Sequence, residues 1–133
     1  MIHHLTLTIL VDNTAGGTGL LGEHGLSVLV QADDHCLLFD TGQGMALPHN
    51  AAKLGVDFPT LDAIVLSHGH YDHAGGLPQV LPHCQQVDLF LHPAAIAPKY
   101  SSRGYIGSPL RDEQSLRDQV RRVVWTETPT EVK

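Results

Sequence analysis

Four side chains with metal-ligand chemistry lie within six consecutive positions of this chain: His68, His70, Asp72 and His73. Neutral imidazole and carboxylate suit zinc and other first-row divalent metals. His68 and His70, two residues apart, can reach one ion from an extended segment. Asp72 and His73 follow at once and can hold a second ion, at the separation of about 3.5–4 Å that is usual in paired sites. The spacing therefore predicts a binuclear metal site. The alternative is a polar loop that happens to be rich in histidine.

The element that positions this cluster is a strand directly before it. Residues 61–66, Leu-Asp-Ala-Ile-Val-Leu, have the β-branched, apolar core of a buried strand. We expect this strand to end at Ser67 and to deliver the cluster into a loop. Gly69 and the pair Gly75-Gly76 allow the tight turns that bring several side chains together.

The segment resembles the His-x-His-x-Asp-His signature of the metallo-β-lactamase superfamily. Other short motifs follow in the order typical of the branch called dihydropterin ribofuranosyl-aminobenzene phosphate synthase-like metal-dependent hydrolases. They lie at residues 11–13, 22–27, 38–44, 50–55, 66–73 and 91–93.

The resemblance implies an α/β fold, the αββα sandwich, in which two sheets face each other with helices outside. It covers nearly the whole chain, residues 1–133, but only the N-terminal half of the family domain, so we expect one mixed sheet with helices on one face. In the family the remaining ligands, a histidine, a bridging aspartate and a final histidine, come from the second half. No histidine follows His92 here. An open apolar sheet face is normally covered by a partner or causes aggregation. Three interpretations therefore stay open. The chain is a fragment or truncated product of a larger enzyme, it forms a homo-oligomer or joins a second chain that supplies the missing half-domain, or it is a compact relic that binds metal weakly.

The function that the resemblance implies is metal-dependent hydrolysis of a small-molecule ester, lactone, amide or phosphoester by a metal-bound hydroxide. Two zinc ions are the expected cofactors, with iron or manganese as options. Asp72 is assigned a catalytic role as well as a ligand role. One alternative is a transferase of pterin biosynthesis that joins a dihydropterin to a ribofuranosyl-aminobenzene phosphate. Another is a non-catalytic metal-binding or interaction module.

Five further residues are candidate members of the site. Asp40, after an apolar strand, is expected to orient a ligand histidine through its other ring nitrogen, although a turn or helix cap is the alternative. Asn13 lies in a glycine-rich loop at residues 12–22, and Glu23 and His24 follow its end. The loop is either a flap that contacts substrate or a flexible connection. His92 follows a strand and is a candidate substrate contact.

Composition limits the partners. The chain has 133 residues, 42% hydrophobic, and a net charge of −6, so it has no basic footprint for nucleic acid or an anionic membrane. No apolar run reaches the roughly 18 residues of a membrane helix, and the N-terminus lacks a signal-peptide pattern. The two cysteines, Cys36 and Cys84, imply no disulfide framework, which fits a cytoplasmic location.

Periodicity and turn residues predict the remaining elements. Strands are expected at residues 5–11, 26–31, 35–39, 87–91 and 123–125, and helices at residues 48–55, 77–81 and 111–122. The stretch at residues 99–103 is polar and carries positive charge. It either contacts a phosphate or carboxylate or lies solvated on the surface, and the solvated state is the default expectation.

Overall fold

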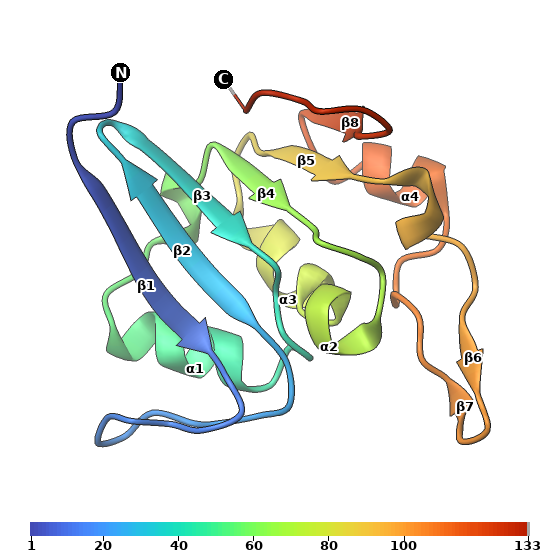
Figure 1. Cartoon of the computed structure of the whole chain (residues 1–133), viewed down its shortest axis with the longest axis horizontal. Coiled ribbons are helices and arrows are strands. Elements are labelled where there is room, and N and C mark those ends of the chain that lie inside the picture. Colours follow the sequence, from blue (N-terminus) through green and yellow to red (C-terminus); the bar gives the residue numbers. More distant parts are fainter. Residues whose placement is uncertain (133) are drawn as a thin grey trace.

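The computed structural model describes residues 1–132, and its centre is a mixed sheet of six strands in the order β1-β2-β3-β4-β5-β8 (Figure 1). The strands are β1 (Leu5–Val11), β2 (Ser27–Ala32), β3 (His35–Phe39), β4 (Ala63–Val65), β5 (Asp88–Leu91) and β8 (Arg122–Trp125). A separate hairpin pairs β6 (Tyr100–Ser101) with β7 (Gly104–Tyr105). The helices are α1 (Ala46–Lys53), α2 (Tyr71–Ala74), α3 (Leu77–Val80) and α4 (Glu113–Arg117), with 3₁₀ turns at Phe58–Thr60, Leu81–His83 and Pro93–Ala95.

The first half of the sheet is an antiparallel meander. β1 pairs with β2, and β2 pairs with β3. The connection between β2 and β3 turns at Asp33, which has a positive φ of 50°. Its carboxylate accepts hydrogen bonds from the backbone N–H groups of His3 and His4, so the turn also holds the N-terminal segment.

The second half of the sheet is parallel, and this positions the site. β3, β4, β5 and β8 run in the same direction. Their carboxyl ends therefore meet at one edge of the sheet, where ligands of open α/β sheets commonly bind. Asp40 follows β3 and the histidine cluster follows β4 at this edge.

One face of the sheet is covered by helices. α1, α2 and α3 lie on the same side of the sheet (Figure 1). Leu38, Ile64 and Leu89 share a cross-strand row and are fully buried. Leu47 of α1 and Val80 of α3 are buried in the same core. This layer is the hydrophobic core of the described chain.

The opposite face of the sheet is apolar and partly open. Ile9, Val28 and Phe39 are cross-strand neighbours on it, and so are Leu7, Val30 and Leu37. On the edge strand the exposure is large, 61% for Leu7 and 60% for Ile9. Contiguous apolar surface of this kind usually marks an interaction face.

These features confirm the expected fold class, an α/β fold with one mixed sheet and helices on one face. Two local expectations were wrong. Asp72 and His73 lie in the helical turn α2 and not in a loop. α4 spans only Glu113–Arg117 of the expected 111–122: Asp112 caps its start by accepting from the Ser115 N–H, and the chain has already entered β8 at Arg122. The stretch at residues 99–103 is largely exposed, as expected, and forms part of the hairpin β6–β7. Among residues 1–132, none of the helices has the length and apolar character to cross a bilayer.

Candidate metal centre

His68, Asp72 and His73 bring three potential ligand atoms within 4.8 Å of one another. The rings of His68 and His73 have centroids 4.2 Å apart. His70 adjoins this group, since its ring centroid lies 4.7 Å from that of His68 in an edge-on arrangement. All four residues predicted as ligands thus converge, although the three-residue group mixes the two expected pairs. Their role as ligands stays a prediction.

Local structure explains this convergence. The chain leaves β4 at Val65, bends at Ser67 and reaches His70, which is extended and caps α2 with its carbonyl oxygen. That oxygen accepts hydrogen bonds from the N–H groups of His73 and Ala74, at 3.1 and 2.9 Å. The segment before α2 thus presents His68, and the helical turn then returns Asp72 and His73 beside it.

Asp40 fixes one of these histidines. Its side chain is fully buried, and its backbone has a positive φ of 58°, a conformation that aspartate tolerates better than most residues. Oδ2 of Asp40 lies 2.8 Å from Nδ1 of His73. A carboxylate at Nδ1 leaves Nε2 of His73 as the ligand atom, which is the arrangement common behind metal-binding histidines. The geometry agrees with the expected orienting role of Asp40, which stays a prediction.

Ser67 was not predicted as a site residue, and it links Asp40 to a second histidine. Its N–H and its hydroxyl donate to the Asp40 carboxylate at 2.8 and 2.6 Å. Its Oγ also lies 2.8 Å from Nδ1 of His68. Only its place directly before His68 hinted at this role.

The protonation state of His68 suits a ligand. Partial burial, followed by the neighbouring rings of His73 and His70, lowers the pKa of His68 from its usual value. The neutral imidazole, which is the form that binds metal, is thereby favoured near neutral pH.

Close backbone packing holds the segment in place. A Cβ at Gly69 would overlap the carbonyl oxygen of Ala95, so the chain can pass only without a side chain there. Thr41, fully buried, donates both its backbone N–H and its hydroxyl to the carbonyl oxygen of His73, at 2.7 and 2.8 Å. The residue pair that follows β3 is therefore hydrogen-bonded to α2 through Thr41.

Of the four residues predicted to contact substrate, only His24 has a contact with the cluster, and the other three bind backbone groups elsewhere. His24 touches it, since its Nε2 lies 3.1 Å from Oδ2 of Asp72. Glu23 instead accepts from the backbone N–H groups of Gln43 and Ala46 at the start of α1. Asn13 accepts from the Gly25 N–H, and Nδ1 of exposed His92 accepts from the Ala94 N–H. Substrate roles for these four residues stay predictions.

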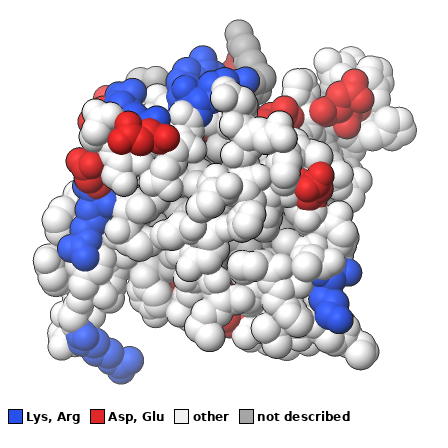
Figure 2. Space-filling view, turned by 180° about the vertical axis from the view of Figure 1, so that it is seen from behind, with Lys and Arg blue, Asp and Glu red and all other residues white. Residues whose placement is uncertain are grey.

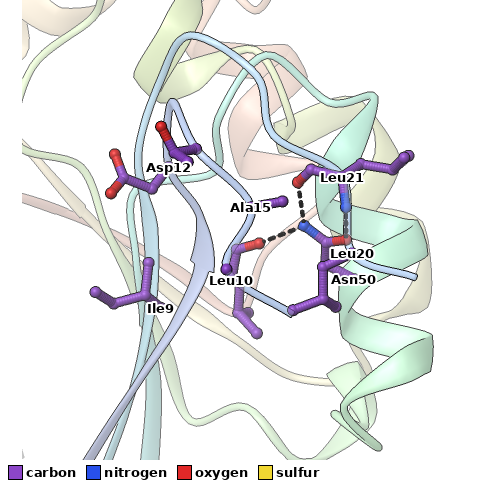
Figure 3. Close-up of a pocket in the computed structure, with 9 residues that line it drawn as sticks. Ile9, Leu10, Asp12, Ala15, Leu20, Leu21 and Asn50 are labelled. Carbon is purple, nitrogen blue, oxygen red and sulfur yellow. Dashed lines mark hydrogen bonds between the residues drawn. The ribbon is translucent and has the colours of Figure 1, made fainter. Parts of the chain in front are cut away.

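The loop at residues 12–22 is anchored to α1. The buried side chain of Asn50 donates to the carbonyl oxygens of Leu10 and Leu21 and accepts from the Leu21 N–H (Figure 3). A hollow of about 220 Å³ lies beside it, between β1 and the loop. The far end of the loop leads to His24, which contacts Asp72.

The donor set fits a divalent metal ion. It combines imidazole nitrogens with a carboxylate, which zinc, iron and manganese all accept. At least one histidine is oriented from behind by a buried carboxylate.

A family model described as the metallo-beta-lactamase superfamily matches residues 20–131. The chain belongs to this superfamily. A solved structure titled as a new diphosphatase from the PhnP family has the same fold, with a TM-score of 0.64 at 22% identity. The match covers 99% of this chain and 54% of the diphosphatase chain.

Relatives in sequence include an uncharacterized protein of Methanocaldococcus jannaschii, 37% identical over 102 residues, or 76% of this chain. The same organism's 7,8-dihydropterin-6-methyl-4-(β-D-ribofuranosyl)-aminobenzene-5'-phosphate synthase is 26% identical over 84% of this chain. Hydroxyacylglutathione hydrolase of Aeromonas hydrophila is 36% identical over 47% of this chain and 23% of its own. The chain spans 40% and 42% of the first two relatives. The resemblance seen in the sequence is thus confirmed.

Proposed function

We propose that this chain carries the metal-binding part of a metal-dependent hydrolase that acts on an ester, lactone, amide or phosphoester. The observation that supports this most directly is the convergence of His68, Asp72 and His73 within 4.8 Å, with His70 beside them. Membership in the superfamily, and a relative named as a hydrolase, support the same class of reaction.

Each residue has a distinct task in this proposal. His68 and His70 would hold one ion, and Asp72 and His73 a second. Asp40 holds Nδ1 of His73, and Ser67 holds Nδ1 of His68, so both rings are set before any ion binds. When bound, such ions supply Lewis acidity and a water of low pKa. Asp72, which also contacts His24, would have a catalytic role as well as a ligand role.

The test is metal content and hydrolysis measured on the same preparations. We expect one or two ions per chain, and we expect His70→Ala and His73→Ala to lower hydrolysis of a panel of esters, lactones and phosphoesters at least 100-fold. His83→Ala is the matched control, because His83 is exposed and outside the cluster. Full activity in His70→Ala would show that the assigned mechanism is wrong.

A transferase of pterin chemistry is a second candidate, supported by the match to the synthase of M. jannaschii. It differs from the hydrolase in needing two organic substrates. Product formed only when a dihydropterin and a ribofuranosyl-aminobenzene phosphate are both present would favour it. Stoichiometric metal without either activity would favour a non-catalytic metal-binding module.

A further inference from the structure

A shallow hollow of about 410 Å³ lies beside α2, on the side formed by the segment that follows β6–β7. It is lined by Gln43, Tyr71, Gly75, Tyr105, Gly107, Pro109 and Arg111. The lining is continuous with the metal cluster along the chain, because Tyr71 stands between His70 and Asp72 and because His70 forms a β-bridge with Gly107.

A second connection runs through Gln43. Its side-chain amide donates to the carbonyl oxygen of His24 at 2.6 Å, and the His24 ring contacts Asp72. None of the four candidate ligands lines the hollow, but two of its lining residues lead to them, Tyr71 along the chain and Gln43 through its hydrogen bond to His24. A substrate whose reacting bond lies at the cluster could extend into this hollow.

The charged group in the hollow is Arg111. Its guanidinium carbon lies 3.8 Å from the centroid of the Tyr105 ring, and the Tyr105 hydroxyl is itself held by the carbonyl oxygen of Ser108 at 2.7 Å. Stacking on an aromatic face restricts the guanidinium plane while leaving its N–H donors free to bind other groups.

Arg111 is one of the basic side chains that have no carboxylate partner within residues 1–132. By contrast, several are occupied by protein groups: Arg117 by Glu113, Arg121 and Arg122 by Asp88, and Lys99 by the carbonyl oxygens of Ala94 and Ala97. An arginine that is positioned by an aromatic ring, unpaired, and directed to a hollow is suited to bind an oxyanion.

Local charge is needed because the chain as a whole does not attract anions. Its net charge is −6. On the face opposite to that viewed in Figure 1, basic and acidic side chains are mixed along the margin, with no broad basic field (Figure 2). Recognition of an anionic substrate must then rest on single, well-placed cations.

We propose that this hollow binds an oxyanion of the substrate, a phosphate or carboxylate group remote from the bond that reacts, with Arg111 as its counter-charge. This inference rests on the proposed hydrolase function, and it narrows the substrate to an anionic compound.

The experiment measures binding of phenyl phosphate and of benzoate to the full chain by NMR titration, on zinc-loaded protein and on the same protein after chelation. The two probes separate phosphate from carboxylate. We expect shifts at the amides of Gly75 and Gly107 in both states, and about tenfold weaker binding in Arg111→Gln, because one charge-assisted contact is lost. Arg111→Lys should retain part of the affinity.

Arg103→Gln is the matched control, since Arg103 is exposed in the turn of the β6–β7 hairpin and lines no part of the hollow. Equal affinity in Arg111→Gln and the unmodified chain would overturn the proposal, as would an equal loss in Arg103→Gln. Binding that disappears on chelation would also overturn it, because the oxyanion would then sit on the metal. Since the chelated arm needs no catalysis, oxyanion binding without hydrolysis would contradict only the proposed function.

Discussion

At the scale of single residues, Asp40 has the greatest influence on the candidate site. Asp40 is fully buried and has a left-handed backbone conformation. Its carboxylate accepts hydrogen bonds from both Ser67 and His73. Strained conformations of this kind persist where the surroundings hold them, often at functional sites. The buried carboxylate thus contacts His73 directly and His68 through Ser67.

We expect Asp40→Asn to weaken zinc binding about 10- to 100-fold, because the charge behind His73 is lost while the left-handed backbone is still tolerated. Titration with a competing chelator measures the affinity. Asp33→Asn is the control, since Asp33 also has a positive φ, of 50°, and lies in the β2–β3 turn. Equal affinity in the Asp40 variant and the unmodified chain would contradict the role assigned to Asp40.

Ser67→Ala should also weaken zinc binding, by about fivefold, because the neutral contact to His68 contributes less than a charged one. The dependence of zinc affinity on pH should also change in this variant, because the Ser67 hydroxyl no longer restrains the His68 ring. Ser102→Ala, in the exposed β6–β7 turn, provides the comparison. The same chelator competition, repeated from pH 5 to 8, distinguishes a specific loss at His68 from general destabilisation.

At the scale of elements, the backbone at Gly69, in the segment after β4, passes close to the backbone at Ala95, in the turn after β5. Gly69→Ala should lower the free energy of unfolding by about 1–3 kcal/mol, because a methyl group there overlaps the backbone at Ala95. Urea unfolding measures the change. Gly16→Ala is the control, since no atom lies within 4 Å of a Cβ built at Gly16. Equal stability of the two variants would show that the segment can move aside.

The ion pairs between Asp88 in β5 and the two arginines at the start of β8 predict that the stability of the fold depends on pH. Hydrogen bonds from Arg121, and then from Arg122, hold the pKa of buried Asp88 below its usual range. A lowered carboxyl pKa stabilises the fold at pH values above the ordinary value of about 3.9, and this stability is lost as the pH falls through the folded-state pKa.

We therefore expect Asp88→Asn to cost about 1–2 kcal/mol at pH 7, since both arginines are half-exposed. The difference from the unmodified chain should shrink below pH 4. Urea unfolding at pH 3, 5 and 7 gives the comparison, with Asp34→Asn in the exposed β2–β3 turn as the control. A difference that stays constant down to pH 3 would contradict the explanation.

At the scale of the whole molecule, the open sheet face is the dominant feature. Leu7 and Ile9 project from an edge strand with more than half of their surface exposed. We expect the chain to self-associate through this face, and we expect Leu7→Gln combined with Ile9→Gln to lower the associated fraction. Light scattering coupled to size exclusion gives the mass. A monomer that binds no hydrophobic dye would contradict this expectation, and Leu21→Gln, on the exposed loop, is the control.

Sequence reasoning was most successful where the determinants are local. The alternation in β1, the apolar runs of β3 and β5, and the spacing of the histidines all depend on neighbours in the chain. The contacts of Ser67 with Asp40 could not be read in this way, because they span 27 positions and require β3 and β4 to be adjacent and parallel. The stacking of Arg111 on Tyr105 likewise depends on the hairpin β6–β7, whose polar sequence has no pattern that predicts strands.

We expect the hydrogen bonds of Asp40 to link metal supply to folding. They connect the end of β3 to the segment after β4, and His68 and His73, the proposed ligands, belong to the same network. An ion that binds this network only in the folded chain stabilises that chain by mass action, by about 2.7 kcal/mol when free metal exceeds the dissociation constant 100-fold. Scarcity of the ion would then shorten the lifetime of the protein against proteolysis, before any effect on turnover is felt.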